Sequence, residues 1–424
     1  MKKFIVLDIN HGGDYLASIL KDRGFEVIVY DIYQTNGEKR QEINKKNIQV
    51  IDSIEKDYKD YTVVHPVHCP DNFLSSFSNN KKLSHHELVK YLFNDKNNVI
   101  EITGSKGKTT TAHVLSYLLS FEEEVFLNSS RGFETFLKGK TKVIDENNSI
   151  SAGYTAKILS EYNKTPQVLE ESLGICGIGN ISILTSTNPV YSIKGGNGSS
   201  LEAKKQLFKL SEGEIIIDGK DKIANDLADE YGKEVIRIWE DVRIELPDYL
   251  QIGKDVHSNI YFKDLELQSK FNGKYLLAGY VNPILFSAMA LKILNKDLEK
   301  MSEHLTMFNG VVNRLSVINE NDYTKIIDKS GGFSEDSLRY LLSLLKMNYD
   351  MFYKNINLLI DLNNVSHCQK IDIYALDSVI GEFGNLVDNA FLLGNHDFER
   401  FKYLKNSTEL NIKTGDILIE CGKW

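Results

Sequence analysis

The pattern of apolar and polar positions predicts that strands and helices alternate along the first part of the chain. Residues 4–9 form a short apolar run, a turn follows at 10–13, and apolar side chains then recur at helical spacing until Gly24. A second apolar run covers residues 27–30. This β-α-β order is typical of a parallel sheet, so we expect an α/β fold.

Later apolar runs predict that the same pattern continues to the end of the chain. The expected strands are residues 62–64, 99–102, 181–184, 215–217, 325–327, 358–360, 391–393 and 417–419. The expected helices are residues 109–119, 201–210, 278–294 and 335–345. Alternating positions in 235–277 indicate antiparallel strands. Ser334 is the expected N-cap of the last helix, with Glu335 and Asp336 in its first turn.

Length and composition restrict the class of protein. With 424 residues the chain is too long for one core, because domains usually contain about 100 to 200 residues. Hydrophobic residues make up 42% and charged residues 26%, as in soluble globular proteins. A net charge of −9 disfavours a broad nucleic-acid-binding surface.

Targeting and cysteine patterns point to a cytoplasmic protein. No apolar run approaches the roughly 18 residues of a membrane helix. Asp8 and Asn10 interrupt the first apolar run, which favours a first strand over a signal peptide. The four cysteines lie far apart without a CxxC pair, so neither a disulfide framework nor a zinc knuckle is expected. We therefore expect a cytoplasmic, multidomain enzyme.

The strongest chemical motif is a shortened phosphate-binding loop, G-x-x-G-K-T, between an expected strand and an expected helix. Ile102 occupies the position at which the longer form of the motif has a glycine. Lys108 is placed to reach the β- and γ-phosphates, and Thr109 to contact Mg²⁺. A chance glycine turn is disfavoured because strand, loop and helix occur in the required order. The predicted phosphate-binding residues are Gly104, Ser105, Lys106, Gly107, Lys108, Thr109 and Thr110.

A second glycine cluster, residues 195–200, also precedes an expected helix. It lacks the Lys-Thr pair that a nucleotide site uses, so an ordinary loop is favoured over a second nucleotide site.

The short loop with its three consecutive threonines resembles the ATP-binding loop of the Mur ligase family. Further segments resemble motifs of this family in the same order along the chain. The matching residues are Glu170, Asn188, Lys204, Asn282, Arg314 and Asp416. The resemblance implies a Rossmann-like N-terminal substrate-binding domain (1–96), a central P-loop ATP-binding domain (97–306) and a Rossmann-like C-terminal domain (307–424).

The resemblance also implies ATP and Mg²⁺ as cofactors, with a carboxylate activated as an acyl phosphate. Thr109 and Glu170 would be metal ligands, and Asn282 would lie on the adenine side. The implied catalytic residues are Lys108, Lys204, Arg314 and Asp328, with Lys204 carbamylated in several family members. Plainer interpretations stay open, because most helical lysines are solvated and Arg314 equally suits a salt bridge at a domain interface.

The chain departs from the family at the acceptor end. Where the family has Asp-Tyr-Ala-His-x-Pro, this chain has residues 328–333, and only Asp328 matches. The second asparagine expected after Asn282 is replaced by Leu285. The histidine-dependent contacts of the family are therefore not carried over to this chain.

Three segments that contain histidine resemble segments of one atypical methanogen branch of the family: residues 11–13, 65–70 and 84–87. Enzymes of this branch close the last carbocyclic ring of a nickel tetrapyrrole acid. This implies a tetrapyrrole acid as substrate. The implied substrate residues are His11, Gly12, Gly13, His65 and His68. The alternative is an amide-forming ligase of the same fold, such as a pseudomurein peptide ligase. A nucleotide-binding regulator without catalysis is disfavoured by the complete phosphate loop.

The histidines leave several interpretations open. His65, His68 and Cys69 are metal-ligand residue types, but their spacing matches no standard zinc site. Substrate contact and a purely structural loop are therefore both favoured over a dedicated metal site. His11 is expected on the first βα turn, where open α/β sheets bind ligands. For His11, a substrate role and a simple turn residue are about equally favoured.

Overall fold

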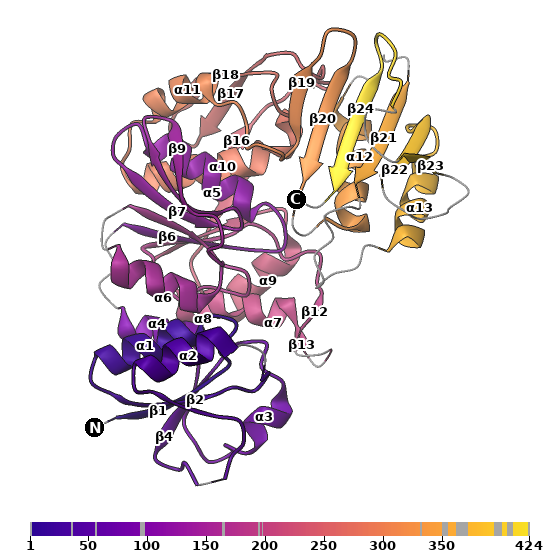
Figure 1. The fold of residues 1–424 in the computed structure, drawn as a ribbon. Helices are drawn as coiled ribbons and strands as arrows, with labels where there is room; N and C mark the ends of the chain where they lie inside the picture. The colour runs from indigo at the N-terminus through magenta and orange to yellow at the C-terminus, as the bar shows by residue number, and fades with distance from the viewer. Residues whose placement is uncertain are drawn as a thin grey trace. The chain divides into compact units, whose positions relative to one another are not determined.

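The computed structural model describes residues 2–34, 37–55, 57–93, 98–162, 166–193, 196, 198–330, 333–349, 355–361, 372–393, 401–404 and 410–422. The chain divides into two compact units, residues 1–241 with 286–294, and residues 242–285 with 295–424. Each unit is described by itself below, and Figure 1 shows the course of the chain through both.

The first unit begins with a five-stranded parallel sheet of order β3-β2-β1-β4-β5. Its elements are β1 (Lys3–Leu7), α1 (Gly13–Asp22), β2 (Glu26–Tyr30), α2 (Gly37–Lys45), β3 (Gln49–Ile51), β4 (Tyr61–His65), α3 (Asp71–Ser75), β5 (Lys82–Ser84) and α4 (His85–Leu92). This strand order is that of a Rossmann-type half. It confirms the parallel sheet that the β-α-β pattern predicts.

Side chains alternate between the two faces of β1, because successive residues of a strand point to opposite sides. Phe4 and Val6 pack in the cluster that contains Leu16 of α1, while Ile5 and Leu7 pack in the cluster of Phe77. These four side chains are each at most 3% exposed. Burying side chains of this size stabilises the fold by about 1.5–3 kcal/mol each.

The second sheet of the first unit holds the phosphate loop. In this unit its strand order is β15-β14-β11-β6-β10-β7-β8-β9, parallel from β15 to β7 and antiparallel through β8 and β9. The strands are β6 (Val99–Thr103), β7 (Val125–Ser129), β8 (Gly132–Leu137), β9 (Lys140–Asp145), β10 (Gln167–Glu170), β11 (Ile181–Leu184), β14 (Glu214–Asp218) and β15 (Ile236–Ile238). The helices are α5 (Lys108–Leu119), α6 (Ala152–Glu161), α7 (Ser200–Lys204), α8 (Gln206–Leu210) and α9 (Lys222–Glu230), with a short β12 (Ser192–Ile193) and β13 (Gly198–Ser199) pair.

The second unit contains an antiparallel group and a largely parallel sheet. The antiparallel group is β16 (Val242–Ile244), β17 (Val256–Phe262) and β18 (Glu266–Phe271), with α11 (Leu298–Met307) against β18. The parallel sheet has the order β19-β20-β24-β21-β22-β23, with only β19 antiparallel. Its elements are β19 (Ser316–Asn319), β20 (Thr324–Lys329), α12 (Glu335–Asn348), β21 (Ile356–Asp361), α13 (Ile373–Glu382), β22 (Asn389–Leu393), β23 (Lys402–Leu404) and β24 (Ile417–Gly422). The 3₁₀ turn η2 (Leu277–Gly279) precedes α10 (Val281–Ile293), whose residues belong to both units.

Three expectations from the sequence need correction. The helix expected over 201–210 is two short helices, α7 and α8, which meet at Lys205. The first strand of the alternating region, β15, pairs in parallel with β14, so the antiparallel arrangement begins at β16. Ser334 precedes α12, but its side chain makes no capping hydrogen bond.

Two further expectations concern residues only partly covered by the structure. The expected boundary at 96 and 97 lies outside the described residues, as do Gly195 and Asn197 of the second glycine cluster. Of the helices in the described part of the chain, none has the length and hydrophobicity that crossing a membrane requires.

Candidate functional site

The phosphate loop leaves β6 at Thr103 and enters α5 at Lys108. Gly107 has φ +86, a left-handed conformation that strains residues with a Cβ. A Cβ on Gly104 would lie 2.2 Å from Thr185 Oγ1, so this position requires glycine as well. The two glycines therefore let the backbone turn tightly over the end of β11, with the N-terminus of α5 facing the loop. This is the geometry that binds phosphate oxygens.

Residues after β11 hold the loop in place. Ser105 N donates to Ser186 O at 2.9 Å, and Lys106 N donates to Ser186 Oγ at 2.9 Å. Thr185 Oγ1 donates to Lys106 O at 2.6 Å. Sequence reasoning assigned no role to Thr185 or Ser186, although the segment 183–188 that resembles a family motif contains both.

The structure brings the predicted metal ligands together across 61 positions of sequence. Thr109 Oγ1 donates to Glu170 Oε1 at 3.1 Å and lies 2.9 Å from Ser130 Oγ. Ser130 N donates to Glu170 Oε2 at 2.9 Å. The hydroxyl and carboxylate oxygens fit Mg²⁺, which prefers oxygen ligands. Lys108 Nζ donates to Gly104 O at 2.9 Å, so its side chain folds back over the loop.

Lys204 is wholly buried, which contradicts the plainer interpretation of a solvated helical lysine. Its Nζ donates to Ser200 O at 3.4 Å and lies 5.2 Å from the centre of the Tyr191 ring. Burial, and then the charge of Lys108, lowers the pKa of Lys204 to about 8. The Lys204 and Lys108 side chains are thus close enough for their charges to interact. At neutral pH, a fraction of the protein molecules carries Lys204 as the neutral amine that carbamate formation requires.

A buried carboxylate pair lies beside the loop, and the sequence analysis missed it. Glu101, in the middle of the wholly buried β6, accepts four backbone N–H bonds of 2.7–3.1 Å from residues 176–179. Glu171 accepts from Thr155 Oγ1 at 3.1 Å and pairs with His86 Nε2 at 3.4 Å. Burial and the charge of Glu171 raise the pKa of Glu101. A single glutamate in an otherwise apolar strand was the signal for this cluster.

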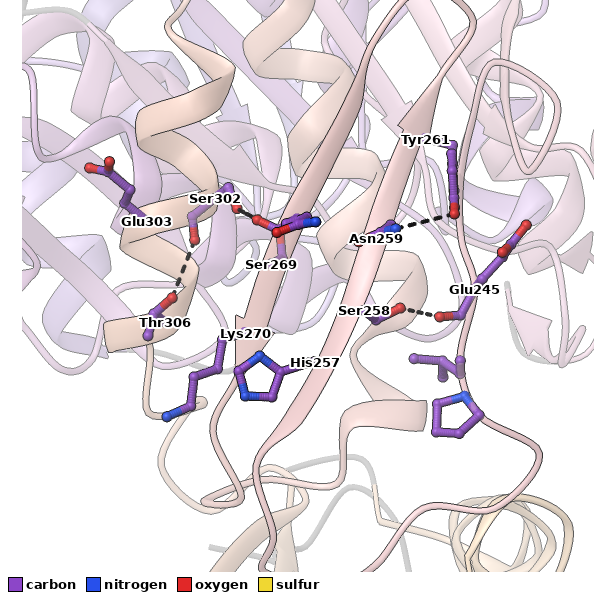
Figure 2. Close-up of a pocket in the computed structure, with 13 residues that line it drawn as sticks. Glu245, His257, Ser258, Asn259, Tyr261, Ser269, Lys270, Ser302, Glu303 and Thr306 are labelled. Carbon is purple, nitrogen blue, oxygen red and sulfur yellow. Dashed lines mark hydrogen bonds between the residues drawn. The ribbon is translucent and has the colours of Figure 1, made fainter.

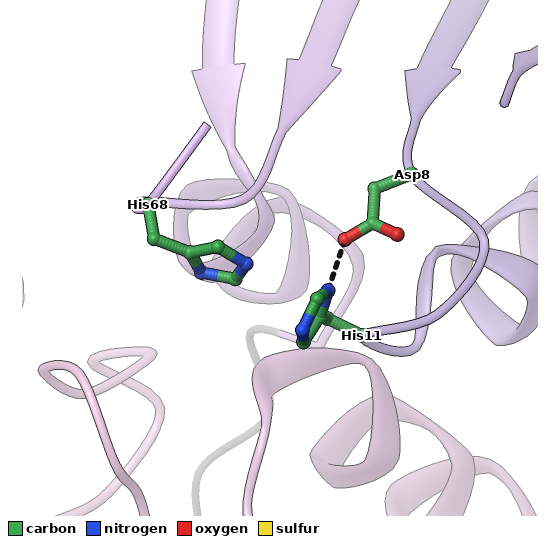
Figure 3. A group of neighbouring side chains, drawn as sticks. All are labelled: Asp8, His11 and His68. Carbon is green, nitrogen blue, oxygen red and sulfur yellow. Dashed lines mark hydrogen bonds and ion pairs between the residues drawn. The ribbon is translucent and has the colours of Figure 1, made fainter. Parts of the chain in front are cut away.

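Three side chains meet at the carboxyl ends of β1 and β4, which are neighbouring strands (Figure 3). Asp8, His11 and His68 each place one ligand atom within 4.8 Å of the others. His11 Nδ1 is hydrogen-bonded to Asp8 Oδ2, and the two imidazole centres are 4.4 Å apart. His65 is not part of this group, and its Nδ1 lies 3.0 Å from Pro66 O.

Burial and the neighbouring side chains set the pKa values of Asp8 and His68. Burial pushes the pKa of Asp8 upward, but the hydrogen bond and charge of His11 outweigh it and hold the pKa below its ordinary value. Burial lowers the pKa of His68 to about 4, so its imidazole is neutral at neutral pH. Gly12 is the N-cap of α1 and Gly13 its first residue, and a Cβ on Gly13 would lie 1.8 Å from Asp8 O.

Two predicted site residues of the second unit, Arg314 and Asp328, lie near the carboxyl end of β20. Leu315 N donates to Asp328 Oδ1 at 3.3 Å, and Lys329 N donates to Asn313 O at 2.8 Å, so the loop that contains Arg314 lies against the end of β20. Tyr280 OH donates to Arg314 O at 2.8 Å. Asn282 lies in the first turn of α10.

A separate cavity of about 690 Å³ in the second unit contains none of the predicted site residues (Figure 2). It lies along β17, β18 and α11 and is lined by polar side chains such as His257, Ser258 and Glu303. The candidate site therefore rests on the residue contacts above and not on this cavity.

No protein-family model matches the chain. A coenzyme F(430) synthetase of Methanosarcina acetivorans is 32% identical over 225 residues, or 49% of this chain and 47% of that protein, so the match spans about half of that relative. A coenzyme F(430) synthetase of Methanocaldococcus jannaschii is 24% identical over 441 aligned positions, which cover 98% of this chain and 97% of the relative.

Among solved structures, the MurF ligase of Thermotoga maritima in complex with ADP is similar to this chain. Its TM-score is 0.60 at 15% identity, and the match covers 93% of this chain and 91% of the other. The chain thus has the Mur ligase fold, which confirms the fold class expected from the sequence.

Proposed function

We propose that this chain, which has the Mur ligase fold, is an ATP-dependent ligase that acts as a coenzyme F(430) synthetase. In this reaction a carboxylate of seco-F(430) acid would be phosphorylated by ATP to give an acyl phosphate and ADP. A base would take the proton of a ring-adjacent C–H group, and this carbon would displace phosphate from the acyl group to close a cyclic ketone. The observation that carries the proposal is the near full-length alignment with the M. jannaschii synthetase. The geometry of the phosphate loop supports it.

The roles proposed for the loop follow from where charge must be neutralised. Phosphoryl transfer needs positioning and electrostatic stabilisation more than covalent help from the protein. Residues 104–110 would surround the phosphates. The backbone N–H groups of residues 107–110, at the start of α5, would hold phosphate oxygens, and the Lys108 ammonium would neutralise the β- and γ-phosphates. Mg²⁺ bound by Thr109 and Glu170 would supply further charge neutralisation. A Glu170→Gln variant with the magnesium dependence of the wild type would contradict this role.

The remaining assignments are also proposals. Asn282 would contact adenine, and Arg314 and Asp328 would act in catalysis at the acyl-transfer stage. His11, Gly12, Gly13, His65 and His68 would line the substrate-binding part of the N-terminal sheet. The domain boundaries 1–96, 97–306 and 307–424 belong to the same proposal.

The proposed substrate is tested by incubating the purified protein with MgATP and either seco-F(430) acid or amino-acid acceptors. We expect phosphate release and a change in the visible spectrum with the tetrapyrrole, and neither in its absence or without ATP. Phosphate release with an amino acid, together with no response to the macrocycle, would show an amide-forming ligase and refute the proposal.

Carbamylation of Lys204 is expected to make turnover depend on carbon dioxide. With a pKa of about 8, about a tenth of the amine is neutral at pH 7, and this fraction rises with pH. Only the neutral amine reacts with CO₂. Protein depleted of CO₂ at pH 7 should therefore lose turnover by about tenfold or more, and bicarbonate should restore it.

The matched control is Lys204→Ala, which should be slow with or without bicarbonate. If depletion leaves wild-type turnover unchanged, or if bicarbonate stimulates the alanine variant equally, Lys204 is not carbamylated.

A further inference from the structure

We propose that Asp8, His11 and His68 bind one divalent transition-metal ion. This site lies at the carboxyl ends of β1 and β4 and is distinct from the magnesium ligands Thr109 and Glu170. The proposal rests on the geometry of these side chains and not on the proposed ligase activity, although His11 and His68 are also proposed substrate residues. The sequence disfavoured a metal site at His65, His68 and Cys69, because their spacing matches no standard zinc site. It gave no sign that His68 would meet Asp8 and His11, since His11 and His68 are 57 residues apart.

The topology of the N-terminal sheet explains why these residues meet. β1 and β4 pair directly and in parallel, with Lys3 opposite Tyr61, so both strands end at the same edge. Asp8 follows β1 immediately, and His68 lies in the loop that follows β4. Ligands of open α/β sheets bind at this edge. The three ligand atoms lie within 4.8 Å of one another.

The imidazole of His68 supplies an independent sign of a missing ligand. His68 Nε2 is buried and has no hydrogen-bond partner in the described part of the chain. Burying a polar nitrogen without a partner costs about 1–3 kcal/mol, so such an atom calls for an explanation. In Figure 3 the ring extends toward Asp8 and His11. A metal ion between the three side chains would satisfy this nitrogen.

Asp8 is held in an uncommon conformation that aims its carboxylate at the group. It is wholly buried and has φ +78, a backbone conformation that few residues other than glycine adopt. Asn10 N donates to its Oδ1 at 2.7 Å, which leaves Oδ2 facing His11. Strain of this kind persists where the surrounding structure fixes it, and it concentrates at functional sites.

The turn that contains His11 is fixed while its side chain remains accessible. Ser151 Oγ donates to His11 O at 3.0 Å, which anchors the turn to the residue before α6. The His11 side chain is 48% exposed, so an ion has a route from solvent. Ligand atoms around one ion lie about 3–3.5 Å apart for metal–ligand bonds of about 2.0–2.2 Å. An ion would replace the direct hydrogen bond between His11 and Asp8, and the exposed His11 side chain would have to move to make room for it.

The donor set selects the class of metal. Two imidazole nitrogens and one carboxylate oxygen suit Zn²⁺, Ni²⁺, Co²⁺ or Fe²⁺, whereas Mg²⁺ and Ca²⁺ prefer oxygen ligands throughout. Three protein ligands leave coordination positions open. Nickel enclosed in a planar macrocycle offers one axial position on each face, so it would engage only one of these side chains. The cluster therefore fits a free ion better than macrocycle-bound nickel.

The test uses the full-length, untagged protein, stripped of metal and kept free of ATP and tetrapyrrole. Co²⁺, Ni²⁺ and Zn²⁺ are titrated against a chromophoric chelator with excess Mg²⁺ present. We expect one equivalent to bind, with a visible d–d band for Co²⁺. Asp8→Asn, His11→Gln and His68→Gln should each weaken binding by at least about tenfold. Asparagine tolerates positive φ, so the first variant keeps the backbone.

His257→Gln is the matched control, because His257 is an exposed histidine on β17. It should bind the ions like the wild type, and the melting temperatures of the metal-free variants identify any that fail to fold. The proposal is overturned if the wild type binds free Co²⁺, Ni²⁺ and Zn²⁺ no more tightly than the variant with all three substitutions. Binding of a nickel tetrapyrrole by the wild type would not rescue it. Equal losses in His257→Gln would also overturn it.

Discussion

Lys108→Ala is expected to lower ATP-dependent turnover by about 10²- to 10³-fold or more while the protein remains folded. Lys108 is the lysine that we propose to neutralise the β- and γ-phosphates, and its Nζ lies 2.9 Å from Gly104 O within the loop. In the absence of this ammonium, charge that develops on the transferred phosphoryl group is less well neutralised. The loop itself should persist, because backbone bonds to Ser186 hold it. Phosphate release in the presence of substrate measures the effect.

Lys140→Ala is the control for this prediction, because Lys140 is an exposed lysine on β9. It should retain wild-type turnover. The result should be the same for a ring-closing and an amide-forming ligase, so this experiment tests the ATP site separately from the substrate. Turnover above about a tenth of the wild-type value in Lys108→Ala would show that Lys108 does not stabilise the transferred phosphoryl group.

Glu101→Ala is expected to destabilise the first unit by about 2–4 kcal/mol. The carboxylate of Glu101 accepts four backbone N–H groups from residues 176–179, all buried in the protein interior. Removing it leaves these donors without an acceptor and opens a cavity in the central strand. Removing Glu101 also removes its charge repulsion with Glu171, which is a gain in stability. The stability lost at the four buried N–H donors is larger than this gain. The shift of the urea unfolding midpoint measures it.

Glu214→Ala is the matched control, since Glu214 is an exposed glutamate at the start of β14. It should unfold within about 0.5 kcal/mol of the wild type. If Glu101→Ala unfolds at the wild-type midpoint, the 176–179 turn is held by other contacts, and the structural role assigned to Glu101 is wrong.

Some parts of the candidate site could be predicted from local sequence. The loop from Gly104 to Thr109 was identified because its glycines, lysine and threonine are contiguous and lie between an apolar run and a helical pattern. Its supporting residues could not be found in this way. Thr185 and Ser186 are ordinary polar residues that matter only because β11 pairs with β6 and ends beside the loop.

The buried charges show the same limit. Lys204 lies on a short helix with little periodicity, and local sequence gives no measure of its burial. Glu101 was visible as a charged residue within an apolar strand, but its partners come from a turn 75 or more residues later. Burial depends on which segments cover a residue, and that is a property of the assembled sheet.

The sequence by itself determined the α/β class, the strands and helices with a clear apolar pattern, and the phosphate loop, because strand and helix periods and tight-turn glycines act over a few residues. The family resemblance implied that Thr109 and Glu170 bind one metal, and the structure shows the contact between them. Only the tertiary structure decided that Asp8 and His11 meet His68. These contacts depend on strand order, in which β1 lies beside β4 and β6 beside β10. Strand order results from the packing of the whole sheet, and no local pattern of residues specifies it.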